Sequence, residues 1–354
     1  MTLQLQFMHT PAAGRAAYIV CAVALAMSGA VVPSVQAEPA PSTASPNPAW
    51  NVYAAPQRLV KLADGRAINI YCLGRGSPTV VLDAGLGDSA VVWRKVHAQL
   101  ATRSKVCAFD RAGSGFSDPG PMPRDAVHIA QDMKAMFSAA GLKPPYVLVG
   151  HSLGGLNVRY YADLQLEEVA GMVLVEPATE HQDKRIVKVL PALAALFDQQ
   201  RSVLQSCLDR LEGKRKPNPE LDQFCEEQPA ADLPAAVNAA AAALSAKPYH
   251  LRSQLSELDG VLGPSSDEVV AARRSYGAIP LIVLTAGNPM VPGLSSSDRE
   301  ALLGIIKQMH GEQAALSSRG TDRVVPDSGH YVQLDQPKAV IDAVADVLAA
   351  VNAN

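Results

Sequence analysis

The residues Gly150-His151-Ser152-Leu153-Gly154 have the pattern of a nucleophile elbow, a sharp turn that exposes a serine between a strand and a helix. Residues 146–149 form a short apolar run that predicts the strand, and the residues from Leu156 onward predict the helix. Glycines are needed around such a turn because a Cβ atom would collide with the adjoining strand and helix. The pattern therefore indicates Ser152 as the nucleophile of a hydrolytic reaction.

A serine hydroxyl is a poor nucleophile until a base accepts its proton, and a histidine usually serves as that base. Of the eight histidines, His330 has the best position, because the turn Ser328-Gly329-His330 directly follows the last predicted strand. His97, His128 and His310 fall within predicted helices, where packing or surface roles are expected. We therefore predict His330 as the general base.

The composition is that of a globular enzyme with one large core, since 48% of the 354 residues are hydrophobic and the formal net charge is -3. The single compact basic run is Lys214-Arg215-Lys216, and we predict that its side chains lie on a solvent-exposed face. It gives no reason to expect a nucleic-acid partner. No cluster of histidine, cysteine and carboxylate has the spacing of a metal site, and no glycine-rich loop carries the lysine of a phosphate-binding loop. We expect neither a metal nor another cofactor.

The N-terminus has the features of a secretory signal peptide. Arg15 precedes an apolar run over residues 16–32, and Val35-Gln36-Ala37 offers the small residues at which signal peptidase cleaves. Residues 1–37 are therefore predicted to be removed, and residues 38–50, rich in Pro, Ala and Ser, to form a flexible leader. This predicts a periplasmic or secreted protein without a membrane span after cleavage.

Strands and helices alternate along the first half of the remaining chain, which predicts an α/β fold with a largely parallel sheet. The next hundred or so residues, 178–278, contain no convincing strand pattern and are predicted to form helices. The strand pattern resumes afterwards. The expected strands are residues 58–62, 68–72, 79–82, 105–109, 146–149, 171–175, 281–285 and 323–325, and the expected core helices are 91–101, 126–140, one from 156, 299–310 and 337–351.

Four landmarks resemble those of the α/β-hydrolase fold superfamily and occur in the order of that family. They are Asp83-Ala84-Gly85-Leu86-Gly87, Asp110-Arg111-Ala112-Gly113-Ser114-Gly115, the elbow, and Ser328-Gly329-His330. The resemblance implies a mostly parallel eight-stranded sheet flanked by helices, with a helical lid inserted after the sixth strand. Residues 51–177 and 279–354 would then form the core, and residues 178–278 the lid.

The resemblance also implies two backbone N–H donors for the oxyanion of a tetrahedral intermediate. One belongs to Leu153, the residue after the nucleophile. The other belongs to Leu86, in the loop where the family's His-Gly is replaced by Ala84-Gly85. The Asp110–Gly115 turn would brace this loop through Asp110 and Arg111.

The triad acid has two candidates. The family usually carries it just after the strand that here spans residues 281–285, but the loop 286–290 contains no carboxylate. Asp298 is the first acid beyond that loop and also suits a helix N-terminus. Glu176 ends the preceding strand directly, an arrangement that resembles some members of the superfamily. We favour Glu176 and keep Asp298 as the alternative.

Four cysteines remain after signal cleavage, an even number that suits an oxidising compartment. In the family's sheet the second strand lies antiparallel beside the fourth. The resemblance therefore implies a Cys72–Cys107 disulfide, which leaves Cys207 to pair with Cys225 in the lid.

Together these features predict an exported serine hydrolase that cleaves a small-molecule carboxylic ester through an acyl-enzyme. The same groups could cleave an amide, as in aminopeptidase-like members, or a carbon–carbon bond. A serine nucleophile disfavours epoxide hydrolase and dehalogenase chemistry, which require a carboxylate. A lidded binding protein without turnover is the alternative of another class.

Overall fold

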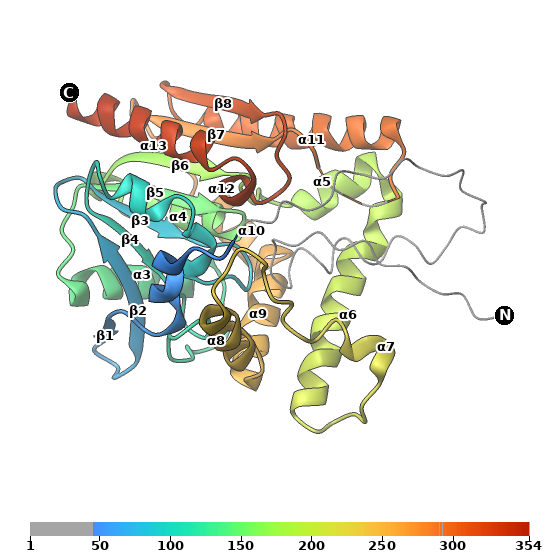
Figure 1. Ribbon diagram of the computed structural model, residues 1–354. Helices are drawn as coiled ribbons and strands as arrows, with labels where there is room; N and C mark the ends of the chain where they lie inside the picture. Colours follow the sequence, from blue (N-terminus) through green and yellow to red (C-terminus); the bar gives the residue numbers. More distant parts are fainter. Residues whose placement is uncertain (1–44, 290, 292, 354) are drawn as a thin grey trace.

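The computed structural model describes residues 45–289, 291 and 293–353 (Figure 1). The predicted signal peptide and residues 38–44 of the leader lie outside the described residues. Pro48–Ala54 forms a 3-10 helix, η1, in which Tyr53 is buried. The predicted leader therefore extends too far, because its last three residues, 48–50, belong to η1. Trp50 packs against the core and lies under the guanidinium of Arg94, 5.6 Å from the ring centroid.

The predicted eight-stranded sheet is confirmed. Its order is β1-β2-β4-β3-β5-β6-β7-β8, with β1 and β2 antiparallel to their neighbours and the remaining strands parallel. Nearly every residue of the central strands is buried, as expected of a sheet covered on both faces. The strands are β1 Leu59–Lys61, β2 Ala67–Leu73, β3 Thr79–Asp83, β4 Val106–Phe109, β5 Tyr146–His151, β6 Val169–Val175, β7 Leu281–Ala286 and β8 Gly320–Val325.

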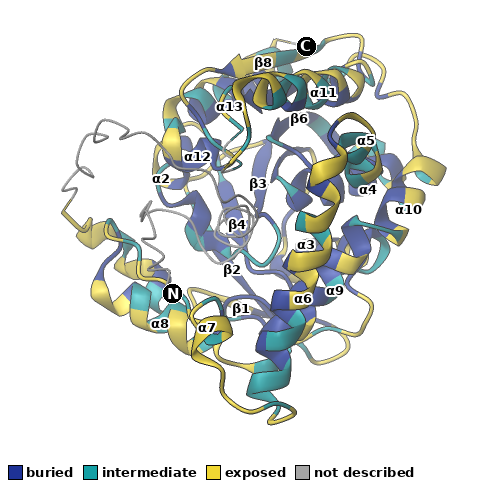
Figure 2. Cartoon of the chain, turned by 90° about the vertical axis from the view of Figure 1, so that its right-hand side faces the viewer, coloured by how far each residue is buried: buried dark blue, intermediate teal, exposed yellow. Residues whose placement is uncertain are grey.

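Two hydrophobic cores fill the space between this sheet and its helices, one on each face. The first contains residues of α3 (Ala126–Ala140) and α4 (Leu153–Leu164), and the second contains residues of α2 (His97–Leu100) and α13 (Pro337–Asn352). Helix α11 (Ser296–Ala314) packs beside β7 and β8 at the sheet edge. The central strands lie buried in the middle of the molecule, with partly exposed helices around them, whereas the edge strand β8 is largely exposed (Figure 2).

One predicted helix, residues 91–101, is wrong in its extent. The segment forms a 3-10 turn, η2 (Ala90–Trp93), and the short α2, with Arg94 to Val96 between them. Its backbone bonds run three residues back, from Val92 to Ser89 and from Val96 to Trp93. Three β-branched valines in seven residues disfavour a continuous α-helix here.

The segment between β6 and β7 consists of helices joined by loops and contains no strand, as predicted for residues 178–278. Helix α9 lies against α6, and α10 lies against α4 of the core. Its α-helices are α5 Gln182–Val189, α6 Ala194–Leu211, α7 Pro219–Asp222, α8 Ala235–Ser245, α9 Pro248–Val261 and α10 Pro264–Ala272 (Figure 1). We refer to residues 178–278 as the helical insertion.

Both predicted disulfides are present. Cys72 on β2 and Cys107 on β4 are direct partners in the antiparallel register and are bonded. Cys207 on α6 is bonded to Cys225, just after α7, and both residues are buried. The second bond ties the long helix α6 to the loop that follows it.

Replacing Cys207 and Cys225 together by serine is expected to lower the free energy of unfolding by about 3 kcal/mol, the value for closing a loop of similar length. The two cysteines are 18 residues apart, and they are buried where serine is less favourable. Urea denaturation followed by circular dichroism measures the change. The matched control is the Cys72→Ser/Cys107→Ser pair, which removes a bond of 35-residue separation. An unchanged urea midpoint for the Cys207/Cys225 variant would contradict the prediction.

Candidate active site

Ser152 occupies a strained turn between β5 and α4. Its φ of 52° and ψ of -119° lie outside the regions that residues with a Cβ ordinarily adopt. The turn is also crowded, since a Cβ on Gly150 would lie 2.3 Å from the Gly154 carbonyl oxygen. A Cβ on Gly154 would lie 2.3 Å from the Asp83 carbonyl oxygen. The two glycines of the motif therefore have the steric role that the sequence predicts.

Backbone hydrogen bonds hold this turn against the end of β6. The Ser152 N–H donates to the Val175 carbonyl at 3.1 Å, and the Ser152 carbonyl accepts from the Ala178 N–H at 2.8 Å. Strain of this kind costs about 1–3 kcal/mol and persists only where surrounding contacts enforce it. The fold thus maintains an unfavourable conformation at the one residue that the sequence marks as a nucleophile.

The two predicted oxyanion donors come from neighbouring parallel strands. Asp83 at the end of β3 pairs with Gly150 of β5, so the loop carrying Leu86 starts beside the elbow. Leu153 is the first residue of α4, where backbone N–H groups have no partner within the helix. Both residues thus lie at the carboxyl edge of the sheet next to Ser152.

His330 follows β8 and is held beside the elbow through its backbone. The Nε2–H of His151 donates to the His330 carbonyl oxygen at 2.9 Å, and the two ring centroids are 4.8 Å apart. The surrounding protein displaces water from the His330 ring, which lowers the pKa of its imidazole and favours the neutral form that a base requires. Among the described residues its ring makes no hydrogen bond to Ser152 or to a carboxylate. Catalytic hydrogen bonds are often long before substrate binds.

Glu176 directly follows β6 at the same sheet edge and has a positive φ of 42°. Its N–H donates to the Leu284 carbonyl at 2.7 Å, and its Oε2 accepts from the Ala286 N–H at 2.6 Å. Burial raises the pKa of this carboxyl group to about 8, and the nearby negative charge of Asp322 acts in the same direction. Glu176 is therefore a partly buried acid without a cationic partner among the described residues.

Asp298, the alternative acid, lies in the first turn of α11. Its N–H donates to the Ser295 hydroxyl at 3.1 Å, and its Oδ2 accepts from the same hydroxyl at 2.8 Å. The first of these two bonds gives a backbone N–H in the first turn of the helix its hydrogen-bond acceptor. The N-cap of α11 is Ser295, so Asp298 lies in the first turn of the helix and is not itself the cap.

His151 is a site residue that sequence reasoning missed. The motif leaves this position variable, so its residue type carries no signal. It is fully buried, contacts the His330 carbonyl, and packs with its ring centroid 5.0 Å from that of Tyr331. Burial lowers the pKa of His151 well below its usual value, so the ring is neutral. No local pattern could have revealed a contact to a residue so far along the chain.

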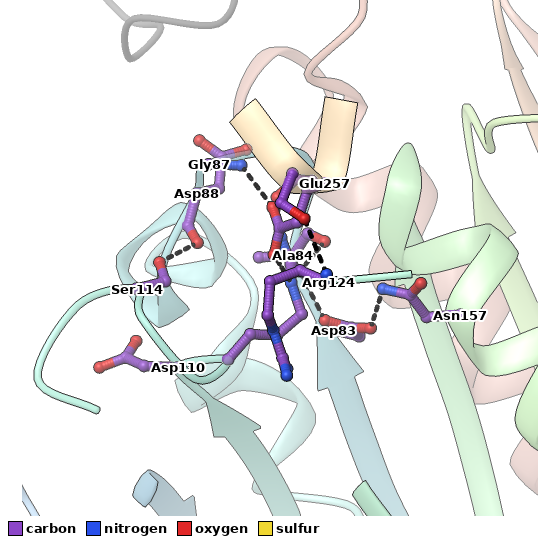
Figure 3. Close-up of polar contacts among 12 residues, drawn as sticks. Asp83, Ala84, Gly87, Asp88, Asp110, Ser114, Arg124, Asn157 and Glu257 are labelled. Carbon is purple, nitrogen blue, oxygen red and sulfur yellow. Dashed lines mark hydrogen bonds and ion pairs between the residues drawn. The ribbon is translucent and has the colours of Figure 1, made fainter. Parts of the chain in front are cut away.

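The Asp110–Gly115 turn braces the loop after β3, in agreement with its predicted role. Asp110 is buried and accepts the Ala90 N–H at 2.8 Å and the Phe116 N–H at 3.0 Å. Arg111 donates to the carbonyl oxygens of Ala84 and Gly85, each at 2.6 Å. Figure 3 shows Asp110 and Ser114 near the end of β3, with the Ser114 hydroxyl bonded to Asp88 of the loop.

A pocket of about 110 Å³ opens beside Leu86, between the loop after β3 and the helical insertion. Leu86, Gly87 and Asp88 form one wall, and apolar side chains of the insertion form another, among them Leu233 and Leu244. Within residues 45–289, 291 and 293–353, no group of three or more potential ligands could hold a metal ion. In the same described part of the chain, no helix is long and apolar enough to cross a membrane.

Comparison with known proteins places these features in a family. The model of the "Alpha/beta hydrolase family" matches residues 80–343. YqjL of Bacillus subtilis, an uncharacterized protein, is 32% identical over 105 residues, which cover 30% of this chain and 42% of YqjL. YbdG of the same organism is 28% identical over 115 residues, which cover 32% of this chain and 35% of YbdG. The chain thus spans less than half the length of these curated relatives.

Solved structures share the fold at low identity. An esterase from Thermogutta terrifontis superposes with a TM-score of 0.53 at 20% identity, covering 83% of this chain and 99% of the esterase. A hydrolase from Pseudomonas aeruginosa gives a TM-score of 0.52 at 18% identity, covering 82% of this chain and 97% of that chain. At these identities the likeness concerns the fold.

Proposed function

The chain belongs to the alpha/beta hydrolase family, and from this premise we propose that it is an exported serine hydrolase that cleaves a carboxylic ester through an acyl-enzyme. The observation that carries the proposal is the strained Ser152, with His330 held beside its elbow by His151. A turn that costs free energy and exposes a serine next to a neutral histidine suits nucleophilic catalysis.

In the proposed reaction, Ser152 Oγ attacks the ester carbonyl carbon while His330 accepts the serine proton. The N–H groups of Leu86 and Leu153 stabilise the negative oxygen of the tetrahedral intermediate. Collapse of the intermediate breaks the ester C–O bond, and the alcohol leaves with the proton from His330. Water then attacks the acyl-enzyme with His330 as base, which releases the acid and restores Ser152.

Glu176 is the proposed acid of the triad. It directly follows β6, the strand that pairs with β5 of the elbow, and among the described residues no cation pairs with its partly buried carboxylate. An imidazolium forming on His330 would supply the missing positive charge. Asp298 is less suited because its carboxylate is engaged with Ser295 at the start of α11.

The pocket beside Leu86 is lined by Leu86 and Tyr331 but not by Ser152 or His330, and we propose that it takes one small group of the substrate. Its volume of about 110 Å³ is well below the roughly 300–1,000 Å³ of sites for drug-sized ligands. The apolar side chains of the insertion suit an apolar acyl or alcohol moiety. A small-molecule ester is therefore the proposed substrate class, and the helical insertion the proposed lid that selects it.

Export is proposed from the predicted signal peptide together with the two disulfides. Disulfides form and persist in oxidising compartments such as the periplasm and the extracellular medium. A mature protein that begins at residue 38 and is recovered outside the cytoplasm is the expected result of expressing the full chain. N-terminal sequencing of that protein tests it, and recovery of the intact chain from the cytoplasm would contradict it.

p-Nitrophenyl esters of rising acyl length, measured beside amino-acid p-nitroanilides, test the reaction class. We expect the highest kcat/KM for short acyl chains, a fall as the chain outgrows the pocket, and much slower cleavage of the anilides. Faster anilide cleavage would favour the amide hydrolase alternative. A folded protein that cleaves neither series and binds small esters would favour the non-catalytic alternative.

A further inference from the structure

Arg111 places a buried positive charge directly behind the predicted oxyanion loop. It is 3% exposed and donates to Asp83 Oδ1 at 2.8 Å as well as to the Ala84 and Gly85 carbonyls. The Gly85 carbonyl and the Leu86 N–H belong to one planar trans peptide unit and point in opposite directions. By holding that carbonyl, Arg111 therefore fixes the direction of the Leu86 N–H.

Glu257 holds the other side of the same residue. It comes from α9 of the helical insertion and is 2% exposed. Its Oε1 accepts from Arg111 Nε at 2.7 Å, and its Oε2 accepts from Arg111 Nη2 at 3.0 Å and from the Gly87 N–H at 3.1 Å. The peptide unit that follows Leu86 is thereby fixed as well. Figure 3 shows Glu257 beside Gly87, with Asp83 on the opposite side next to Asn157.

Helix α9 is also packed tightly onto this region. A Cβ on Gly87 would lie 2.4 Å from the amide nitrogen of Gln254, and a Cβ on Gly113 would lie 1.9 Å from the Ser253 hydroxyl. The absence of a Cβ on Gly87 and on Gly113 thus allows α9 to pack close to the two loops that carry these glycines. A helix in such contact with the core is a fixed wall of the site.

We propose that Glu257 is a positioning residue, which aims the Leu86 N–H at the oxyanion through Arg111 and through the Gly87 N–H. The inference rests on the proposed function, and it assigns a catalytic contribution to the helical insertion. The insertion then completes the oxyanion hole in addition to covering the site. Without Glu257, the peptide units on both sides of Leu86 lose part of their fixation, and one of two aimed donors becomes free to turn away.

The charges around Arg111 allow Glu257 to be substituted without leaving a buried charge unpaired. Two carboxylates, Asp83 and Glu257, share the single guanidinium of Arg111. In Glu257→Gln one carboxylate remains to pair with Arg111, so no buried cation is left without a partner. The amide also keeps the size of the side chain. Glu257→Gln should therefore fold, whereas Glu257→Ala also removes the acceptor for the Gly87 N–H.

We expect Glu257→Ala to lower kcat for a short p-nitrophenyl ester by about 100-fold, as for loss of one oxyanion donor, with KM changed less than about threefold. Glu257→Gln should give a smaller loss, since its amide oxygen can still accept from Gly87. Inhibition by a short alkylboronic acid, whose tetrahedral adduct needs the same donors, should weaken in parallel with kcat. A role confined to stability would alter neither the boronic acid affinity nor kcat of the folded protein.

Asp132→Asn is the matched control. Asp132 on α3 accepts from Arg66 at 2.6 Å and from Arg124 at 2.7 Å, in a partly buried ion pair that does not touch the loop of Leu86. This variant should melt at a lower temperature with unchanged kcat. If folded Glu257→Ala keeps the kcat and boronic acid affinity of the parent chain, the inference is overturned.

Hydrogen exchange separates this inference from the proposed function. Peptides that cover residues 82–90 should exchange faster in Glu257→Ala than in the parent chain and in Asp132→Asn, whatever the reaction. A parent chain without esterase activity contradicts the proposed function. The hydrogen-exchange rates of residues 82–90 still test whether Glu257 holds this loop. Unchanged exchange overturns that role.

Discussion

Replacing Ser152 by alanine is expected to lower kcat for ester hydrolysis by about five to six orders of magnitude, because no other group can form the acyl-enzyme. The same change should abolish covalent labelling by a fluorophosphonate probe, which reacts with an activated serine. Mass spectrometry of the labelled parent chain should identify the peptide that contains Ser152. Alanine removes one oxygen from a turn that already accommodates a Cβ, so the fold should be retained.

Ser296→Ala is the control for labelling. Ser296 is an exposed serine at the start of α11 and lies outside the proposed site. This variant should keep full labelling and full turnover. Labelling that survives Ser152→Ala would show that another serine reacts, and a folded parent chain that is never labelled would contradict the proposed nucleophile.

Glu176→Gln is expected to lower kcat by about four orders of magnitude, as for loss of the acid from a serine triad. Glutamine keeps the size of the side chain and an oxygen that can accept the Ala286 N–H. It cannot carry the negative charge that stabilises the imidazolium of His330. KM should change little, since the acid acts on the base and not on the substrate. Steady-state kinetics on a p-nitrophenyl ester measures both constants.

The pH dependence gives a second measure of the same residue. Burial raises the pKa of Glu176 to about 8, so the carboxyl group is mostly protonated below that pH and ionised above it. The pKa of His330 is lowered, so its ring is already the free base near neutral pH. We therefore expect kcat/KM to rise with pH through about 8. The rise should disappear in Glu176→Gln.

Asp298→Asn is the matched control for the acid. Asn keeps a side-chain oxygen that can accept from the Ser295 hydroxyl, so the variant should keep its stability and nearly its full kcat. A large loss in Asp298→Asn with little loss in Glu176→Gln would assign the acid to the loop after β7 instead. Large losses in both would contradict the proposed division of roles.

The sheet and the elbow could be predicted because their signals are local. Strand β5 begins with a continuous apolar run, and glycines flank the turn after it because a Cβ at their positions would clash. The α3 boundaries were also predictable, since Asp125 caps the first turn and Gly141 ends the helix with a φ of 68°. Each of these features depends on neighbours along the chain.

The contacts that organise the site could not be predicted because they join distant segments. Neither the hydrogen bond from His151 to the His330 carbonyl nor the bond from Gly87 to Glu257 has a signal in the spacing of residues. The extent of the helix over residues 91–101 failed for a related reason. A continuous helix was expected there, but its three valines disfavour one, and the segment divides into η2 and α2.

The bond from Gly87 to Glu257 closes a loop of 170 residues, and the bond from His151 to His330 spans 179. Contacts of such sequence separation form late, because the entropy of a large loop must be overcome before they contribute. A chain emerging from the ribosome or from a translocation channel can fold its first strands long before residue 257 is available. The proposed oxyanion loop and the proposed base His330 therefore reach their final arrangement only near the end of folding, and recovery of activity should be the slowest signal when the protein is refolded.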